Sequence, residues 1–352
     1  MQNLSFITIF LGILIGVVEL QAQEQDNLHT FSRDEKNIHL AKDFKGIEIH
    51  NQHGDIVVTA WMKDTIQVKI EMSVTATHRE MADEVFERLS ISITKLNGMA
   101  YMRTAFEEEF HSAHPFRINY EIFMPADKQV KIDNRFGNIT ISDITGKLEI
   151  NSEYGNVTQT GLQRVDTVVS KISFGEANFK SINFTKTELY NSGLKIENVE
   201  TASIFGKYCQ IDIGKAGILD FSNETARINV DEVKDVNLTG QFCFVSIDEI
   251  MKNGKFEISN GLLITSLSEQ TNEFSVFNKN APANINISPE LSYTLQGEVT
   301  DGNFRHDKDS HFKIISDLNK ISFSGEYTNR KEEMATLILF NKNAGINIKT
   351  QK

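Results

Sequence analysis

Residues Val130 to Ile141 read VKIDNRFGNITI, and this stretch decides the fold. Apolar and polar side chains alternate on both sides of a short polar corner, which is the pattern of β-strands with one buried face. Gly137 at the corner is expected to supply a backbone conformation that β-branched residues adopt only at a cost. The residues expected to point inward are Val130, Ile132, Asn134, Ile139 and Ile141.

The same pattern recurs along the chain. Three further copies are IEIHNQHGDIVV (Ile47 to Val58), LEINSEYGNVTQ (Leu148 to Gln159) and VVSKISFGEANF (Val168 to Phe179). The corner glycines are spaced 18, 20 and 18 residues apart, at Gly137, Gly155, Gly175 and Gly193. Aromatic residues are expected to stack beside them, at Phe136, Tyr154 and Phe174. A fixed period of this size predicts rungs that stack along one axis and bury a continuous apolar column.

Beyond Gly193 the pattern continues in short in–out–in strands such as Leu194-Lys195-Ile196. Corners are expected at positions that keep spacings of 18 and 19 residues, namely Asn223, Gln241 and Asn260. The segment from Gly193 to Gly206 is shorter and predicts one contracted rung. An antiparallel sandwich of short strands is the alternative. The fixed period favours an all-β, right-handed, single-stranded β-helix, or β-solenoid.

An insertion, residues 63–129, separates the first copy of the pattern from the second. It is expected to begin with a strand, Thr65 to Thr75, and to continue as a short helix. Thr77 is the expected N-cap, with Glu80 three residues later in a capping-box arrangement. The apolar face of this helix is Met81, Ala82, Val85, Phe86 and Leu89. We expect the helix to cover the open N-terminal end of the solenoid, whose free edge would otherwise pair with other strands.

The C-terminal segment, from Thr271 onward, is less periodic and is expected to form a β-rich cap at the other end. Its strands are expected at residues 312–315, 320–323 and 336–340, and Asn341 to Ala344 resembles a hairpin turn. The predicted division of the chain is a signal peptide (1–22), an N-terminal cap with the first rung and the insertion (23–129), solenoid rungs (130–270) and the C-terminal β cap (271–352).

The N-terminus predicts export. Phe6 to Val18 is an apolar run of signal-peptide length and too short to span a bilayer. Leu20 and Ala22 suit signal-peptidase cleavage before Gln23. The alternative is an uncleaved N-terminal anchor. The mature chain has no further apolar stretch of transmembrane length, so we expect it in the periplasm, on the cell surface or outside the cell.

Charge and cysteine content narrow the class of protein. The formal net charge of −12 disfavours nucleic acid and anionic membrane surfaces as partners, because both bind clustered Lys and Arg. Cys209 and Cys243 lie in apolar stretches about two rungs apart, or roughly 9–10 Å at the usual strand spacing. This separation is too large for a disulfide, so two free, buried thiols are expected.

β-Helices include carbohydrate-active enzymes, so a catalytic site is one candidate for this chain. Such sites need clustered carboxylates with a nearby Arg or Lys. The candidates are Asp133, Glu149, Asp143 and Arg135, of which Asp133 and Glu149 are about one rung apart. Outward-facing carboxylates in an acidic protein are usually only solvated. We therefore expect no catalytic residue and no cofactor.

The best candidate for a metal site is the acidic segment Glu107 to His114, EEEFHSAH. In a strand, His111 and His114 would point to opposite faces, which defeats chelation, so an acidic loop without a metal is expected. His50 and His53 lie at the first corner. Stacking with the corner aromatics accounts for His53.

The corner motif, the expected signal peptide, the helix-bearing insertion and the segment Tyr120 to Pro125 that leads into VKIDNRFGNITI together resemble a known family. It is the "putative adhesin" family of β-solenoid cell-envelope proteins, also catalogued as a domain of unknown function and abundant in Bacteroidetes. The resemblance covers residues 38–350 and is clearest from Glu121 to Gly161. It implies the fold and provides no catalytic or ligand residues to carry over.

These observations predict a non-catalytic exported envelope protein. As an adhesin or interaction scaffold, it would present a repetitive β face to an envelope protein or a glycan. Two alternatives stay open at this point, a carbohydrate-active enzyme on the same scaffold and a periplasmic sensor or assembly partner.

Overall fold

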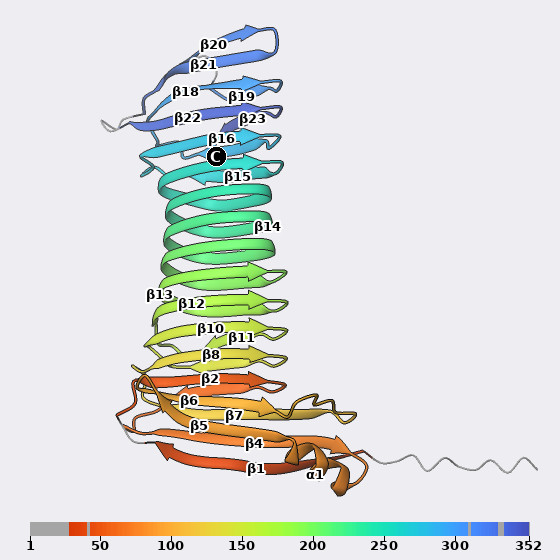
Figure 1. The fold of residues 1–352 in the computed structure, drawn as a ribbon. Coiled ribbons are helices and arrows are strands. Elements are labelled where there is room, and N and C mark those ends of the chain that lie inside the picture. Colours follow the sequence, from red (N-terminus) through yellow and green to blue (C-terminus); the bar gives the residue numbers. More distant parts are fainter. Residues whose placement is uncertain (1–27, 41–42, 309–310, 330–333, 352) are drawn as a thin grey trace, which may run out of the picture.

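The computed structural model describes residues 28–40, 43–308, 311–329 and 334–351. The expected signal peptide, residues 1–22, lies outside this part of the chain. Within it the fold is almost entirely β-strand, and its one α-helix is α1 (Arg79–Glu87). Figure 1 shows strands piled one above another along a single long axis.

The strands of the repeat form two parallel ladders. The first ladder contains β2 (Gly46–Gln52), β8 (Gln129–Arg135), β10 (Lys147–Glu153) and β12 (Val165–Ser173). The second contains β3 (Ile56–Ala60), β9 (Ile139–Ser142), β11 (Val157–Thr160) and the start of β13 (Glu176–Tyr190). Leu148 lies between Val130 and Val168 in the first ladder, so neighbouring strands pair in register. We call one strand of each ladder, with the corner that joins them, a rung.

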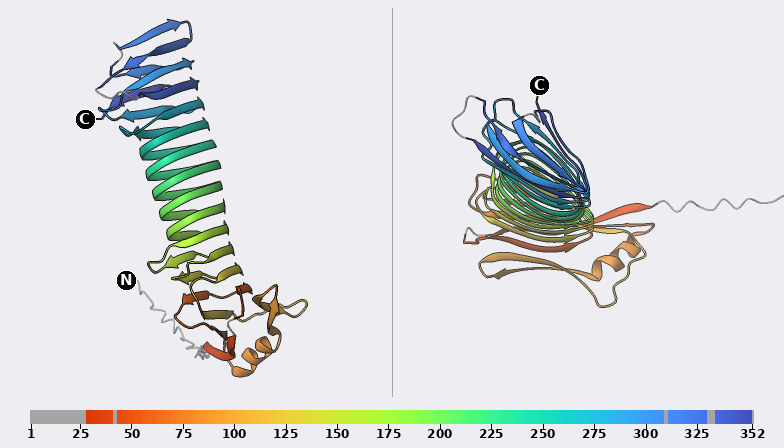
Figure 2. Two further views of the ribbon diagram at one scale, coloured as in Figure 1. Left: turned by 90° about the vertical axis from the view of Figure 1, so that its left-hand side faces the viewer. Right: turned by 90° about the horizontal axis from the view of Figure 1, so that it is seen from above.

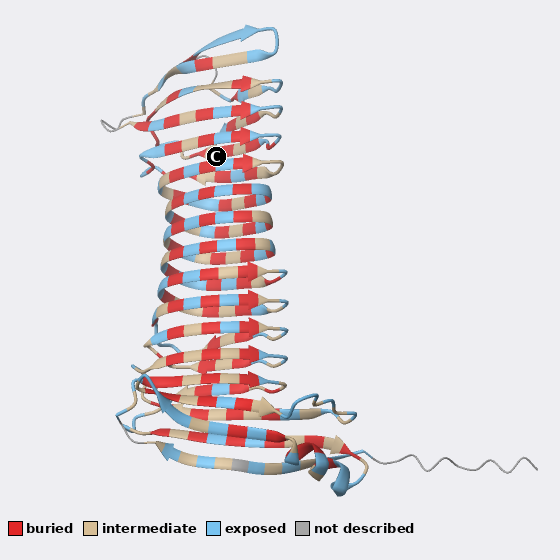
Figure 3. Cartoon of the chain, in the orientation of Figure 1, coloured by how far each residue is buried: buried red, intermediate tan, exposed pale blue. Residues whose placement is uncertain are grey.

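Burial follows the alternation that the sequence predicted. All five predicted inward residues around the first corner, from Val130 to Ile141, are buried. Figure 3 shows buried and exposed positions alternating along successive rungs. Seen down the axis, the rungs superimpose around one interior (Figure 2). The apolar column of the core therefore runs the length of the molecule.

The corners owe their shape to the residue before the glycine, which corrects the predicted role of Gly137. Phe136, Tyr154 and Phe174 have φ between 55° and 59°, in the left-handed region, whereas Gly137 has no positive φ. The glycine is required for a different reason. A Cβ at Gly137 would lie 1.9 Å from the carbonyl oxygen of Gly54 in the neighbouring rung. The rungs are therefore too close at this point for any side chain.

Backbone hydrogen bonds link each corner to the next. The N–H of Phe136 donates to the carbonyl of Glu153 at 3.0 Å, and the N–H of Tyr154 donates to that of Ser173 at 3.0 Å. The predicted ring stack is confirmed. Phe136 and Tyr154 have centroids 5.2 Å apart, and Tyr154 and Phe174 have centroids 4.8 Å apart, with nearly parallel planes.

The rungs after Phe174 are regular, so the predicted single contracted rung is wrong. Left-handed corner residues recur every 17 residues at Asn191, Tyr208, Thr225 and Phe242, and then at Asn260. Asn260 is the one predicted corner in this region that is right. Asn223 and Gln241 lie before the corner, and Gly193 lies one position too late because Ser192 follows the left-handed residue. Strand structure runs without a break through these rungs and their corners, so that they carry a single label, β14 (Gly193–Ser259).

The N-terminal end carries antiparallel strands. Below the first rung lie β6 (Met99–Phe106) and β7 (Phe116–Met124), which pair in parallel with β2 and β3. Further out, β5 (Leu89–Leu96) pairs with β6, β4 (Ile66–Ala76) with β7, and β1 (His29–Leu40) with β4, all antiparallel. The strands of the insertion, and not the helix alone, therefore cover this end of the ladders.

The helix exists where the insertion predicted one, but its cap differs. The N-cap is His78, without a side-chain cap bond, so the predicted Thr77 cap and capping box are wrong. Thr77 Oγ1 instead bonds to the sulfur of Met81 at 3.4 Å. The helix buries Ala82, Val85 and Phe86 against the strands, as predicted, whereas Met81 is exposed.

The C-terminal end has a rung out of sequence order. The rungs above β14 are formed by β15 (Leu262–Leu267), β16 (Glu273–Lys279) and β17 (Ala283–Ile287), followed by β18 (Tyr293–Thr300) and β19 (Phe304–His306). The final strands, β22 (Ala335–Lys342) and β23 (Ile346–Thr350), lie between these groups, since β22 pairs with β16 and β18 and β23 with β17 and β19. The segment Asn341–Ala344 is thus a rung corner, and the predicted hairpin turn is wrong because β22 and β23 are in different ladders.

The two cysteines are free and buried, which confirms the expectation. Cys209 and Cys243 each follow a left-handed corner residue, the position that glycine holds in the earlier rungs, and Ala226 occupies it in the rung between them. Burial, with a smaller effect of Cys243 nearby, raises the pKa of Cys209 to about 12. Burial also raises the pKa of Cys243.

Gly155→Ala should destabilise the fold strongly, because the new Cβ would lie 1.9 Å from the carbonyl oxygen of Gly137 and force two rungs apart. We expect the free energy of unfolding to fall by about 3 kcal/mol, at the upper end of overpacking effects, measured by urea denaturation. Gly193→Ala is the matched control, because its Cβ would meet only the flexible Glu176 side chain at 3.2 Å. Equal losses in the two variants would contradict the close approach at the corner.

Cys209 should resist alkylation in the folded protein at pH 9.0, where an ordinary thiol of pKa 9.0 is half ionised. Iodoacetamide followed by mass spectrometry should find neither thiol modified in the folded chain and both modified in urea. Because the folded pKa lies above the unfolded value, the unfolded chain binds fewer protons between pH 9.0 and about 12, so stability should fall as the pH rises through this window. Rapid labelling of the folded chain would disprove the burial.

Candidate functional site

Exposed aromatic side chains lie along the edge of the molecule where the corners of successive rungs are stacked. The lower part of this edge is a continuous stack, because His53 lies 5.0 Å from Phe136 with an interplanar angle of 18°, and Tyr154 and Phe174 continue above it. Burial, and then the charge of Arg135, lower the pKa of His53, which favours the neutral ring. In this stack the faces of inner rings are covered by their neighbours, and only their edges meet solvent.

Above Phe174 the rings are separated. The corner residues Asn191 and Thr225 alternate with Tyr208 and Phe242, so each of these rings has a small neighbour below it. Rings on alternate rungs are about 10 Å apart at the usual strand spacing. Tyr208 and Phe242 are each about half exposed, at 53% and 49%. The rings of the lower stack have similar exposed fractions, 41% to 49%, but Tyr208 and Phe242 stack on no other described ring. The ammonium of Lys207 lies 5.7 Å from the centre of the Tyr208 ring.

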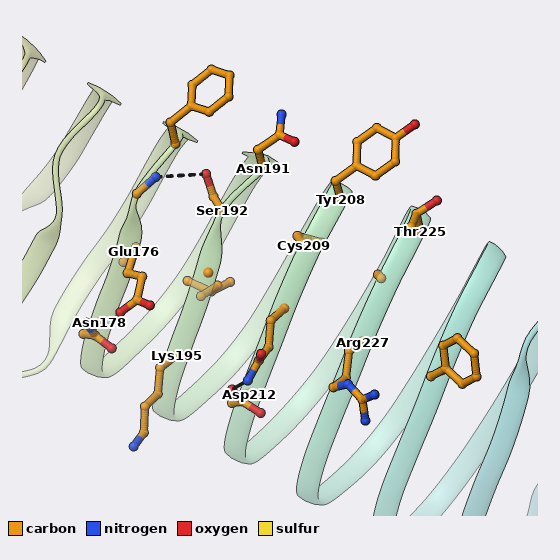
Figure 4. Close-up of a pocket in the computed structure, with 18 of the residues that line it drawn as sticks. Glu176, Asn178, Asn191, Ser192, Lys195, Tyr208, Cys209, Asp212, Thr225 and Arg227 are labelled. Carbon is orange, nitrogen blue, oxygen red and sulfur yellow. Dashed lines mark hydrogen bonds between the residues drawn. The ribbon is translucent and has the colours of Figure 1, made fainter.

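A groove runs along the second ladder beside these rings. We call it the corner groove; its volume is about 800 Å³. The small residues that follow the corners, Gly175, Ser192, Cys209 and Ala226, leave space between the ring edge and the outward row of the ladder (Figure 4). Phe174, Tyr208, Phe242 and Phe244 supply its aromatic surface.

Polar side chains line the opposite side of the corner groove. Asp212 accepts hydrogen bonds from Gln210 at 2.9 Å and from Asn229 at 2.7 Å, so its carboxylate is held in place. Arg227 lies 6.0 Å from the Phe244 ring centre. Neither Arg227 nor Lys195 forms an ion pair with any residue that the structure describes. The corner groove therefore combines ring faces, a fixed carboxylate and cations available to a ligand.

The candidate carboxylates are brought together only in part. Asp133 and Glu149 line one shallow concavity on the first ladder, of about 480 Å³. Each is already engaged, since Asp133 accepts from Asn151 at 3.0 Å, and Glu149 lies 2.6 Å from the ammonium of Lys147. These contacts belong to polar rows that tie one rung to the next. They do not resemble a general acid facing a nucleophile.

The other two candidates have structural roles. Arg135 pairs with Glu153 at 3.3 Å and lies over the ring of Phe136. Asp143 does not line this concavity. Its carboxylate accepts a hydrogen bond from the backbone N–H of Leu162 at 3.0 Å, beside Gly161. Arg135 and Asp133 both line a second concavity, of about 450 Å³, whereas Glu149 and Asp143 do not line it.

The acidic loop lies between β6 and β7, where its rung lacks a tight corner. Glu107 pairs with Arg88 at 3.3 Å, and Ser112 bonds to the carbonyl of His114 at 2.7 Å. Among the described residues, His111 forms no hydrogen bond or ion pair with another side chain of a metal-binding type. Across the described residues, no group of three or more His, Cys, Asp or Glu side chains is placed to hold a metal ion.

His50 belongs to an inter-rung network. It bonds to Glu48 at 3.0 Å, and Lys131 pairs with the same carboxylate at 2.8 Å. Burial alone would raise the pKa of Glu48, but the hydrogen bonds from Lys131 and His50 outweigh it and lower that pKa. Networks of this kind stabilise the stacking of rungs and leave no group free for chemistry.

The sequence did not predict the corner groove. The sequence does contain a signal for it. Tyr208, Thr225 and Phe242 follow one another at 17-residue intervals, and each is followed by a small residue. That spacing was missed because the corners were placed from Gly193, Asn223 and Gln241. In the described part of the chain, no helix has the length and apolar character needed to cross a membrane.

Comparison with known proteins gives weak matches. No family model matches the chain. Among curated proteins it is 22% identical to polyribonucleotide nucleotidyltransferases of Lysinibacillus sphaericus and Bacillus licheniformis, over 66% and 68% of its length. The chain spans about a third of the length of these enzymes, 32% and 33%.

Solved structures described as "putative adhesin" are also similar to this chain. One from Parabacteroides merdae is 13% identical, covers 74% of this chain and 97% of its own, and has a TM-score of 0.35. Those from Parabacteroides distasonis and Bacteroides fragilis are each 9% identical over 92% of this chain and 97% of their own, with TM-scores of 0.32 and 0.28. At such TM-scores these matches carry no conclusion about the fold or function of this chain.

Proposed function

We propose that this chain is a non-catalytic exported protein of the bacterial cell envelope that binds a glycan along the corner groove. In this proposal the stacked rungs form a right-handed β-solenoid, and the signal peptide, residues 1–22, is removed. The mature chain then consists of an N-terminal cap (23–129), solenoid rungs (130–270) and a C-terminal β cap (271–352). The observation that carries it is the pair of half-exposed, unstacked rings, Tyr208 and Phe242, on alternate rungs of one groove.

The chemistry of the corner groove fits sugar rings. The C–H faces of a pyranose pack on aromatic faces, and the hydroxyl groups bond to amides, carboxylates and guanidinium groups. Tyr208 and Phe242 supply the first kind of surface, and Asp212, Gln210 and Arg227 supply the second. An extended chain lying parallel to the axis would meet the same set of groups on successive rungs.

The rigidity of the platform supports binding. Backbone hydrogen bonds tie the corners on either side of the groove to the next rung, from Phe174 to Tyr190 at 3.1 Å, from Asn191 to Lys207 at 3.0 Å and from Asn260 to Lys279 at 2.9 Å. A ligand therefore meets groups that are already ordered, and little conformational entropy is lost on binding.

The proposal of a non-catalytic role rests on the carboxylates. Catalysis of glycoside cleavage needs two carboxyl groups facing one bond, one of them able to hold a proton. Asp133 and Glu149 are instead engaged with Asn151 and Lys147. A glycan cleaved by the purified protein would overturn this part of the proposal.

Tyr208→Asn should weaken glycan binding about tenfold, the upper range for the loss of one aromatic contact. Asparagine occupies the same left-handed corner position at 191, 260 and 280, so the fold should tolerate it. Binding would be screened on a glycan array and then measured by isothermal titration calorimetry with the best polysaccharide found. Tyr154→Asn is the matched control, because the faces of that ring are already covered by Phe136 and Phe174. Equal effects, or no polysaccharide bound, would reject the corner groove as a glycan site.

Protease treatment of intact cells should digest the protein if it reaches the cell surface, with lysed cells as the reference. Digestion on intact cells places the corner groove where external glycans are available. Protection until lysis places the protein in the periplasm, excludes a role in adhesion to other cells, and directs the search to periplasmic glycans.

A further inference from the structure

The outermost strand at the C-terminal end has an unpaired edge. β21 (Lys320–Tyr327) pairs with β18, and β20 (Phe312–Asp317) pairs with β21. No other strand in the described ranges pairs with β20, which lies at the top of the molecule in Figure 1. The backbone N–H and C=O groups on its far side are therefore available to another strand.

The edge at the opposite end is protected. β1 has a register shift between Asp34 and Lys36, and a bulge of this kind disrupts pairing with a further strand. Its charged side chains also reach neighbouring backbone groups. Lys36 Nζ donates to the carbonyl of Ile91 in β5 at 2.7 Å.

β20 lacks a register shift, and its charged side chains are Lys313 and Asp317. Its register with β21 is continuous from Phe312 to Asp317. Ile314 and Ile315 are 40% and 52% exposed, and Leu318 just beyond the strand is fully exposed. A regular, exposed, apolar edge strand is the kind that pairs with another chain.

The charges on β20 are complementary to those on a second, antiparallel copy of β20. Lys313, Ile315 and Asp317 share one face, with Lys313 and Asp317 about 13 Å apart, too far to pair within one chain. Neither forms an ion pair with another described residue; Lys320, which lies opposite Asp317, pairs with Glu298 at 2.6 Å. An antiparallel second copy centred on Ile315 would place Lys313 of each copy opposite Asp317 of the other.

We propose that β20 is a self-association edge, through which two copies of this chain pair antiparallel about a twofold axis at Ile315. The pairing adds main-chain hydrogen bonds, two Lys313–Asp317 contacts and an apolar contact between the two Ile315 side chains. The ladders of the two copies would then continue into each other at their C-terminal ends, and both corner grooves would stay exposed.

Sedimentation velocity of the purified protein over a concentration series tests this edge. The wild-type protein should form dimers. Lys313→Asp should weaken the dimerisation constant about tenfold, because two attractive pairs become two repulsive ones. The double variant Lys313→Asp, Asp317→Lys restores opposite charges across the twofold axis and should recover the wild-type constant.

Circular dichroism and the melting temperature of each variant would verify folding, since both residues are at the surface. A wild-type protein that stays monomeric at every concentration would overturn the proposal. So would a dimer that Lys313→Asp leaves unchanged, because the contact would then lie elsewhere. A double variant no stronger than Lys313→Asp would also overturn it, since the effect would not come from pairing of these two residues.

Discussion

The close approach of one rung to the next at the corner is the constraint on which the other features depend. Two requirements meet there. One residue adopts a left-handed backbone, and in the lower rungs the residue after it must be glycine, because a Cβ at Gly155 would lie 1.9 Å from the carbonyl oxygen of Gly137. The later rungs hold small residues at this position, such as Ser192 and Ala226. Given both, the corner N–H reaches the carbonyl of the next rung, the ladders stay in register, and inward residues fall above one another. The core, the ring stack and the corner groove all follow from this repeated geometry, because each is a column of residues at one position of the rung.

The two ends of the stack of rungs differ from its middle, because the first and last rungs of a repeat leave unpaired strand edges unless other segments cover them. Both ends use a rung out of sequence order followed by antiparallel strands. At the N-terminal end, β6 and β7 lie below the first rung, and the chain then crosses to the other side to form β8. At the C-terminal end, β22 and β23 enter between rungs that precede them in the chain. Unravelling a terminal rung therefore requires the release of strands that lie far from it in sequence, which makes the ends resistant to fraying.

The sequence predicted the positions that depend on alternation and missed those that depend on packing between rungs. Val130, Ile132 and Ile139 were identified as inward-facing because alternation is a local property of a strand. Gly137 was identified for the wrong reason, since contact with Gly54 across 83 residues cannot be read from local pattern. After Gly175 the glycine signal disappears, because Ser192, Cys209 and Ala226 hold that position and each has a Cβ, so the close approach seen at Gly137 and Gly155 does not recur there. The corners were misplaced as a result. The out-of-order C-terminal rung was not predictable either, as Asn341 to Ala344 has the local composition of a hairpin turn.

The same misplacement explains why the candidate site escaped the sequence. A search for chemistry looks for charged clusters, and it selected Asp133 and Glu149, which serve to tie rungs together. The corner groove depends instead on corner positions that lack an aromatic ring, within the column of corner residues that the stacked rungs form. Where aromatic corners follow one another, as from Phe136 to Phe174, the rings cover each other and the edge of the coil is closed. Where Asn191 and Thr225 interrupt the column, Tyr208 and Phe242 stack on no other described ring, and the corner groove lies beside them. The interruption of one column therefore changes the surface of the molecule, while the corner at Asn191 keeps its backbone hydrogen bond to Lys207 at 3.0 Å.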